Sequence, residues 1–206
     1  FYISDDLIAA FDDNDLRKQH YIKKEGSYYI LQKVRWDSKD HPSAKCTVSE
    51  NFLFRTAEAY LNLAEAAALD EEKAREMIGL LQAKRFAVPP VVSATGNDLI
   101  DLIREERQRE LCLEGHRWYD LRRYTVCTKY PWSKVIRHIY RDYKYDRDLG
   151  EDIAYKQRVY ELKEYDKAYT LALPHEVTEF QNTLSRNERP ERQPVETIGG
   201  DETPEE

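Results

Sequence analysis

The chain has 206 residues and a net charge of −7, with 34% charged and 41% hydrophobic residues. This composition predicts a globular protein with one good core or two small ones, and no apolar run approaches the roughly 20 residues that a membrane-spanning helix needs. The acidic balance argues against nucleic acid as a partner, and three widely spaced cysteines suggest neither a disulfide framework nor a zinc site.

The amino-terminal residues predict two short helices and a β-hairpin. Ser4 can cap a helix over 5–11, and a second turn can follow Asp15, because both side chains accept N–H bonds at helix starts. Residues 20–36 alternate like a hairpin with Gly26 in its turn. The first residues already have an amphipathic pattern, so we expect the chain to be a fragment of a longer protein.

The clearest predicted helix covers residues 52–69, FLFRTAEAYLNLAEAAAL, in which apolar residues recur every three or four positions. Ser49 or Asn51 can cap this helix. Asp70 begins a partner helix over 71–86. The joint between the two helices is so short that they must be antiparallel, and their many alanines allow a close approach of the two axes.

A third long helix is predicted with Asn97 as its cap. Its buried face begins with aliphatic residues and continues, at helical spacing, through Glu106, Glu110 and Leu113. Two carboxylates therefore lie on or beside an apolar stripe. A glycine then interrupts the helix, and residues 116–123 resume it.

Basic side chains crowd these carboxylates in the segment 104–124, REERQRELCLEGHRWYDLRRY. One turn of helix could make Glu106 and Glu110 a general acid and base. We favour structural ion pairing, because neighbouring arginines would keep both groups ionised and lower their pKa. We expect Glu114 to pair with Arg117, and Asp120 with Arg123. The predicted structural ion-pair network comprises Glu106, Arg107, Arg109, Glu110, Glu114, Arg117, Asp120 and Arg123.

The remainder of the chain changes to a period of two, which is typical of strands. Residues 135–145 and 153–165 alternate, with a turn at 148–150 between them. A last strand is predicted over 168–173, and a short helix over 175–181. Proline, glycine and charged residues dominate the end of the chain, so we expect an irregular or disordered tail there.

Aromatic and basic residues alternate in the segment 129–147, KYPWSKVIRHIYRDYKYDR. Such a mixture can stack single-stranded nucleic acid, but the overall acidity argues against that interpretation. The rings could instead stack on sugars, while core packing is the alternative for each ring because half of an alternating strand faces inward. The candidate ligand-binding residues are Tyr130, Trp132, Tyr140, Tyr143 and Tyr145.

Sequence motifs of catalysis or cofactor binding are missing. The chain has no HExxH, GxSxG, GxGxxG, paired-cysteine or phosphate-loop pattern. His116 beside the helix-breaking glycine could be a ligand or a base, but a lone histidine is a weak indication. We therefore predict no catalytic residue, no metal and no cofactor.

Four segments in a specific order resemble a known family. They are AEAYLNLAEA (57–66), LLQAKRF (80–86), EERQRELCLEGHRWYDLRRY (105–124) and YTLALPHEVTEFQNTLSRN (169–187). This order resembles the carboxy-terminal half of SusD/RagB-like proteins. The closing segment departs from the family pattern, since it has Leu-Ala-Leu-Pro where the family favours Leu-Pro-Ile-Pro. We expect the family's amino-terminal half, with its lipid-anchored cysteine, to lie outside this fragment.

The resemblance implies a mainly α fold of tetratricopeptide-like helix pairs with short β-hairpins and long loops, arranged as an α/α superhelix. It assigns residues 1–187 to a SusD/RagB-like carboxy-terminal domain and leaves 188–206 as the acidic tail. It further implies non-catalytic capture of oligosaccharides at the extracellular face of an outer membrane. The partner would be a SusC-like TonB-dependent transporter, and contact with the membrane would be only through the absent lipid anchor. The alternatives are a protein–protein scaffold without sugar binding and a glycosidase that uses Glu106 and Glu110.

Overall fold

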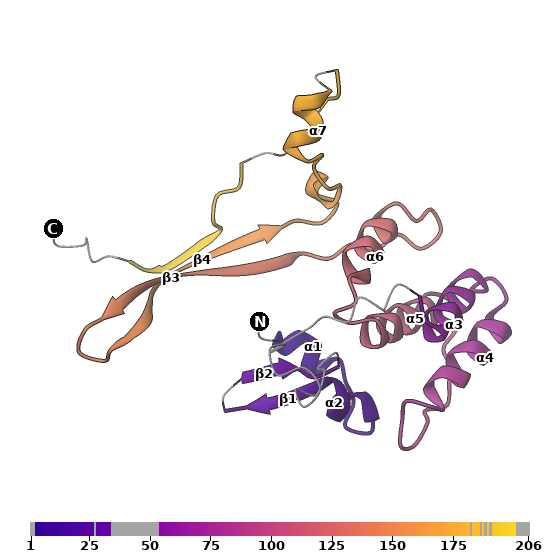
Figure 1. Ribbon diagram of the computed structural model, residues 1–206. Coiled ribbons are helices and arrows are strands. Elements are labelled where there is room, and N and C mark those ends of the chain that lie inside the picture. The colour runs from indigo at the N-terminus through magenta and orange to yellow at the C-terminus, as the bar shows by residue number, and fades with distance from the viewer. Residues whose placement is uncertain are drawn as a thin grey trace. The chain divides into compact units, whose positions relative to one another are not determined.

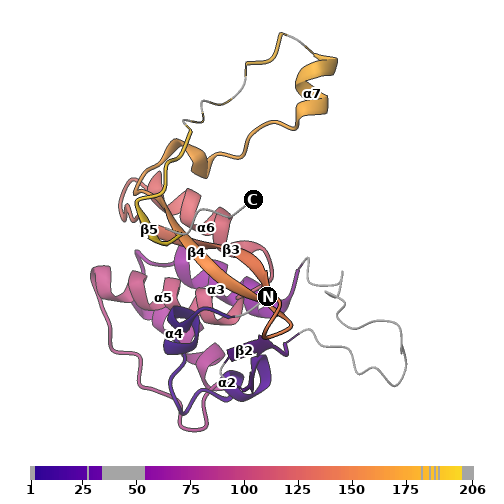
Figure 2. The same ribbon diagram turned by 90° about the vertical axis from the view of Figure 1, so that its left-hand side faces the viewer.

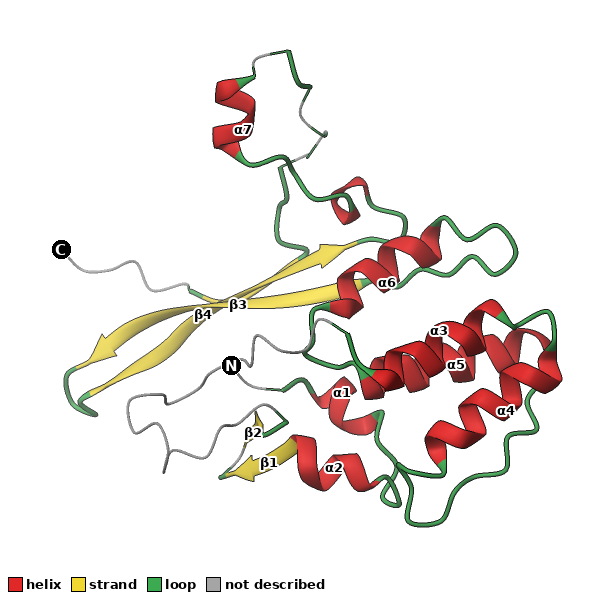
Figure 3. Cartoon of the chain, turned by 45° about the vertical axis from the view of Figure 1, so that its right-hand side comes forward, coloured by secondary structure: helices red, strands yellow, loops and turns green. Residues whose placement is uncertain are grey.

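The computed structural model describes residues 3–26, 28–33, 54–181, 183–185, 187, 189 and 191–200. The chain forms two compact units, Phe1–Arg117 and Trp118–Glu206. Helices account for more of the described residues than strands do (Figures 1 and 3). The helix-rich character that the sequence predicts is therefore present.

The amino-terminal part of the first unit contains two short helices and a hairpin: α1 (Asp5–Ala9), α2 (Leu16–Tyr21), β1 (Ile22–Glu25) and β2 (Tyr28–Leu31). The predicted caps are confirmed. Ser4 Oγ accepts the N–H of Leu7, and Asp15 Oδ1 accepts the N–H of Arg17 at 2.9 Å. A hairpin is present within the predicted range 20–36, over 22–31, whereas residues 20–21 belong to α2 and residues 34–36 lie outside the described residues. Its Gly26 has a φ of +60°, which glycine adopts without strain.

Three longer helices form the main core of the first unit: α3 (Thr56–Ala66), α4 (Glu71–Gln82) and α5 (Gly96–Glu110). The helix α4 returns alongside α3, and α5 lies against both (Figure 3). Alanines at the contact, such as Ala64 and Ala74, are fully buried and let the backbones approach. Leu61, Ile78 and Ile103 fill the space between the three helices.

The starts of two helices differ from the predictions. The predicted caps of the first long helix, Ser49 and Asn51, lie outside the described residues, but α3 begins only at Thr56. The helix starts late because Arg55 is extended, with φ −143° and ψ 156°, and its side chain binds Glu110 at the end of α5 and Glu114 just after it. Likewise, α5 begins at Gly96 and not after Asn97.

The end of α5 corrects the predicted buried face. The helix ends at Glu110, and a turn follows, in which Leu113 has a φ of +64°. Leu113 was expected to be buried, but it is 48% exposed, while Leu111 and Cys112 are buried in its place. The helical spacing fails here because the turn before Gly115 changes the direction of each side chain. The resumed helix is confirmed as α6 (His116–Thr125).

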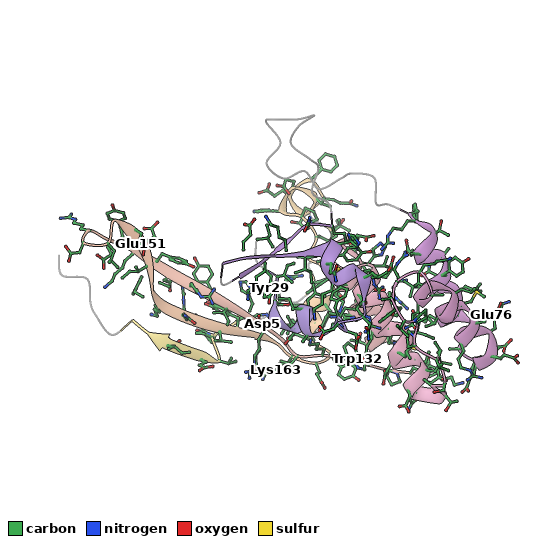
Figure 4. The ribbon with its side chains drawn as sticks, turned by 90° about the horizontal axis from the view of Figure 1, so that it is seen from below. Asp5, Tyr29, Glu76, Trp132, Glu151 and Lys163 are labelled. Carbon is green, nitrogen blue, oxygen red and sulfur yellow. The ribbon has the colours of Figure 1, made fainter. Side chains whose placement is uncertain are left out.

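The second unit is built on a long antiparallel hairpin with a third strand: β3 (Ile136–Asp146), β4 (Glu151–Leu162) and β5 (Glu196–Gly199). The predicted hairpin is confirmed, since these strands of 11 and 12 residues lie close to the predicted ranges 135–145 and 153–165. Only the family resemblance implied shorter hairpins. Figure 4 shows Glu151 at the turn end of the hairpin and Trp132 and Lys163 at the opposite end. Side chains stand out from both faces of the ribbon (Figure 4).

The segments around β5 depart from the predictions in two places. The strand expected over 168–173 is wrong, because Asp166 caps a 3₁₀ turn, Lys167–Tyr169, by accepting the Ala168 N–H at 2.8 Å. The short helix that follows is confirmed as α7 (His175–Phe180). The tail was expected to be irregular throughout, but its residues 196–199 form β5 beside β4 (Figure 2), since β4 offers an unpaired edge.

Candidate functional site

The first unit contains two carboxylates that are fully sealed from solvent. Glu106 and Glu110 are each 0% exposed, on consecutive turns of α5. Arg17 of α2 lies between them, with its Nη1 2.5 Å from Glu106 Oε1 and 2.8 Å from Glu110 Oε2. Asp15 holds the other side of the same guanidinium at 2.7 Å. One arginine thus ties the amino-terminal elements to α5.

Further partners complete the coordination of each carboxylate. Glu106 also accepts hydrogen bonds from Arg109 at 2.9 Å and from the Gln82 amide at 3.0 Å. Glu110 also binds Arg55 at 2.5 Å and Arg85 at 2.8 and 2.9 Å. All of these cations come from helix boundaries, where the chain can turn a side chain inward.

These contacts determine the protonation of both carboxylates. Burial raises the pKa of Glu110, but hydrogen bonds from Arg85 and Arg55 outweigh burial and lower the pKa to about 2. Burial raises the pKa of Glu106 as well, but the charges of Arg17 and Arg109 outweigh burial, so the pKa is lowered. Both groups stay ionised and engaged near neutral pH, which suits structural ion pairing and not proton transfer.

The predicted network is partly correct in its partners. The pairs of Arg109 with Glu106 and of Arg123 with Asp120 are present, each at 2.9 Å. Glu114 binds Arg55, at 2.9 Å, and Lys33, two cations that the prediction did not name, and its pairing with Arg117 stays a prediction. Arg107 donates to Asn62 at 2.7 Å and lies 3.7 Å from Glu58, so this arginine contacts α3.

Sequence reasoning missed five members of this network. All five lie outside the glutamate–arginine segment and join it only through tertiary contacts. One signal was available: two glutamates on an apolar stripe require cations from elsewhere in the chain, because an unpaired buried charge is costly. The missed residues are Asp15, Arg17, Lys33, Arg55 and Arg85.

The five aromatic candidates do not form one platform in the second unit. Tyr140 lies on the same face of the hairpin as its cross-strand neighbour Arg158, whose guanidinium carbon is 4.9 Å from the ring centroid. Strand alternation places Tyr143 and Tyr145 on the opposite face. These two rings are 58% and 63% exposed, so the alternative of core packing is wrong for them.

The other two candidates precede β3 and have local partners. Trp132 packs edge-on against the buried ring of Tyr124, with centroids 6.1 Å apart. Lys129 Nζ lies 5.1 Å from the centre of the Tyr130 ring. The structure therefore brings Tyr143 and Tyr145 to one face and separates them from the other three rings along the strand or across the sheet.

A pocket of about 410 Å³ lies elsewhere in the second unit, and we call it the Trp118 pocket. Its floor is the hairpin face that carries two cross-strand pairs, Ile136 with Leu162 and His138 with Tyr160. Trp118 of α6 forms a wall and packs on Tyr169, with ring centroids 5.3 Å apart and a tilt of 31°. The remaining lining residues are Glu161, Ala168, Leu171, Arg189 and Arg192.

Two residues near the end of the chain, Asn187 and Arg192, form hydrogen bonds with segments that line or flank this pocket. Asn187 donates to the carbonyl of Leu171 at 2.9 Å. Arg192 donates to the carbonyl of Glu161 at 3.0 Å and to Asp166 Oδ1 at 2.6 Å. The pocket therefore has aromatic and apolar walls and two arginines, and hydrogen bonds hold the chain around it. Sequence reasoning missed it because its lining comes from five separate stretches of the chain.

Other chemistry is limited in the part of the chain that the structure describes. No three His, Cys, Asp or Glu side chains among those residues come together as a metal site would require. Burial raises the pKa of the Cys112 thiol, which makes it a poor nucleophile. No described helix combines the length and the apolar character that crossing a membrane would need.

Comparisons with known proteins show which family the chain belongs to. Among solved structures, the chain is similar to a SusD-like carbohydrate binding protein from Bacteroides vulgatus, with 20% identity and a TM-score of 0.47. The similarity covers 75% of this chain and 33% of that protein, so the chain spans about a third of its length. No curated protein sequence gives a significant match. The sequence of residues 6–192 matches the profile of the SusD family, and the chain therefore belongs to the SusD family, as the order of its motifs predicted.

Proposed function

We propose that this chain is part of a non-catalytic protein that captures oligosaccharides at the extracellular face of an outer membrane. The captured glycan would pass to a SusC-like TonB-dependent transporter, and residues 1–187 would be the carboxy-terminal portion of the longer protein. Membership of the SusD family supports this proposal.

The observation that carries the proposal is the Trp118 pocket. Its volume of about 410 Å³ lies within the range of roughly 300–1,000 Å³ that is typical of small-molecule sites. Trp118 offers an aromatic surface to the apolar face of a sugar ring, and Tyr160 and His138 offer groups that can bond to hydroxyls. Aromatic stacking with a few directed polar groups is how protein sites orient ligands.

The absence of turnover is proposed on separate grounds. A glycosidase needs one carboxylic acid with a raised pKa beside a second, ionised carboxylate. Glu106 and Glu110 are instead both buried, both ionised and both bound to arginines. Neither could protonate a leaving group or admit a substrate.

Isothermal titration of the full chain against a panel of neutral and acidic oligosaccharides tests this function. We expect micromolar to millimolar affinity for some members and no product after long incubation. Trp118→Leu keeps an apolar side chain at this position but removes the aromatic ring, so it should weaken binding. Robust hydrolysis, or affinity that Trp118→Leu leaves unchanged, would contradict the proposal.

A protein–protein scaffold is the second candidate, and one observation favours it. Three leucines are exposed although leucine is usually buried: Leu63 of α3, Leu80 of α4 and Leu69 in the turn between the two helices. A tetratricopeptide-like helix pair could use them to hold a partner helix. Titration against purified transporter separates the two functions: Leu63→Gln should weaken that binding and leave glycan affinity intact.

A further inference from the structure

We propose that the Trp118 pocket selects an anionic sugar, with the ring of a uronic acid unit against Trp118 and its carboxylate on the guanidinium of Arg189. This inference rests on the proposed function and names its class of ligand. It comes from the charges around the pocket and from the character of its walls.

Two of the charged groups in the lining already have ionic partners. Glu161 pairs with Arg137, at 2.7 Å between Oε1 and Nη2. Arg192 pairs with Asp166 at 2.6 Å. These pairs leave His138, Tyr160 and Arg189 as the remaining titratable or charged side chains of the lining. The balance of the pocket is therefore positive, although the whole chain carries −7.

Arg189 is the side chain that produces this positive balance. Its Nη2 donates to the carbonyls of Thr170 at 2.9 Å and Ala168 at 3.4 Å, and both acceptors are uncharged. Among the described residues, no carboxylate lies within ion-pair distance of Arg189. Asp166 feels its charge from farther away, but the hydrogen bond from Arg192 is the main reason for the lowered pKa of that carboxyl.

The geometry of a guanidinium decides what this arginine can bind. Arg189 uses one nitrogen for the two carbonyls, and a guanidinium carries five N–H donors in a planar fork. The Nε and Nη1 donors that remain can each form a charge-assisted hydrogen bond to a carboxylate oxygen. The two carbonyl bonds also hold the arginine in place, which reduces the entropy that a ligand must remove.

The rest of the pocket restricts the anion to one attached to an apolar ring face. Trp118, Ile136 and Leu162 give carbon surface, which a small inorganic anion cannot use. A neutral sugar could use that surface but would leave Arg189 without an ionic partner. A uronic acid has both parts, a ring with C–H faces and a carboxylate beside it. Both features of the pocket are then engaged at once.

Matched ligand pairs test the selection without changing the protein. Each acidic oligosaccharide of a panel, such as oligogalacturonate, oligomannuronate and oligoglucuronate, is titrated beside its neutral methyl ester. We expect at least one acid to bind about tenfold or more tightly than its ester, since charge-assisted hydrogen bonds are the stronger class. Sulfated oligosaccharides form a further arm, and binding of these alone would overturn the assignment to a uronic acid.

A variant then locates the effect. Arg189→Gln should remove the difference between acid and ester, while Arg141→Gln, the same charge change on an exposed residue of β3, should preserve it. Thermal unfolding of both variants checks that the fold is kept. Equal affinity for acid and ester would overturn the inference and leave the proposed capture function standing. Absence of binding by every glycan, acidic or neutral, would overturn the proposed function as well.

Discussion

The two units of the chain differ in which side chains they bury and which they leave exposed. The first unit buries its charges, with Glu106, Glu110 and Arg17 sealed between helices. The second unit leaves aromatic rings such as Tyr143 and Tyr145 on exposed strand faces. Buried ions fix how helices meet, whereas exposed rings and a lined pocket remain available to a ligand. We infer that the first unit is architecture and the second unit is where a ligand binds.

This difference has an energetic basis. A buried carboxylate is tolerated only when its partners replace the lost hydration, and losing one partner leaves a charge uncompensated. Surface pairs such as Arg137 with Glu161 contribute at most about 1 kcal/mol, because water screens them. Substitutions in the first unit should therefore alter stability, and substitutions in the second unit should alter binding.

The largest expected effect comes from Glu110. Glu110→Gln leaves Arg55, Arg85 and Arg17 without their shared carboxylate, so the free energy of unfolding should fall by about 3–5 kcal/mol. Urea unfolding of the full chain measures the loss. The matched control is Glu105→Gln on the same helix, where the side chain is 68% exposed, and its effect should stay below about 0.5 kcal/mol. Equal effects of the two variants would remove the contrast between the units.

Acid should unfold the first unit through the same carboxylate. The pKa of Glu110 is about 2 in the folded chain and 4.5 in its ordinary state. Its stabilisation is therefore complete above pH 4.5 and is lost as the pH falls toward 2, a loss of roughly 3 kcal/mol. Unfolding curves of the wild-type chain between pH 6 and 2 follow it. In Glu110→Gln this part of the pH dependence should disappear, and its persistence would assign the transition to other groups.

The next effect concerns binding by the second unit. Trp118→Leu should weaken glycan affinity by about tenfold, or about 1.4 kcal/mol, because an aromatic contact is lost. The comparison is the double variant Tyr143→Ala and Tyr145→Ala, which tests the exposed rings as an alternative stacking surface. Calorimetric titration with the tightest glycan decides between them. A larger loss in the double variant would move the proposed site from the pocket to the exposed hairpin face.

The smallest expected effects have opposite signs in the two units. Gly79→Ala in α4 meets no atom within 4 Å, so it should stabilise the first unit by about 0.5–1 kcal/mol. Gly199→Ala in β5 would place its Cβ 2.6 Å from the Tyr155 carbonyl oxygen at a φ of +77°. It should cost about 1 kcal/mol and loosen β5 locally.

Thermal unfolding measures the stabilisation expected from Gly79→Ala. Faster hydrogen exchange of the backbone amides over residues 156–159 in β4 would show the loosening of β5 expected from Gly199→Ala. Unchanged exchange in Gly199→Ala would show that β5 contributes little to the second unit.

The sequence by itself determined the features that depend on near neighbours. The caps at Ser4 and Asp15, the hairpin turn at Gly26 and the break at Gly115 arise from interactions within a few residues, so they can be predicted without a fold. The ionic role of Glu106 followed from its helical spacing in the same way. The motif order also determined the family.

Only the tertiary structure decided which residues meet across the chain. Arg17 and Glu106 are 89 positions apart, and their pairing depends on how α2 packs against α5. The faces of Tyr140 and Tyr143, the strand β5 and the Trp118 pocket likewise depend on strand register and on a returning chain end. Spacing along the sequence cannot determine such contacts, because they form only when distant segments are brought together by the burial of apolar surface.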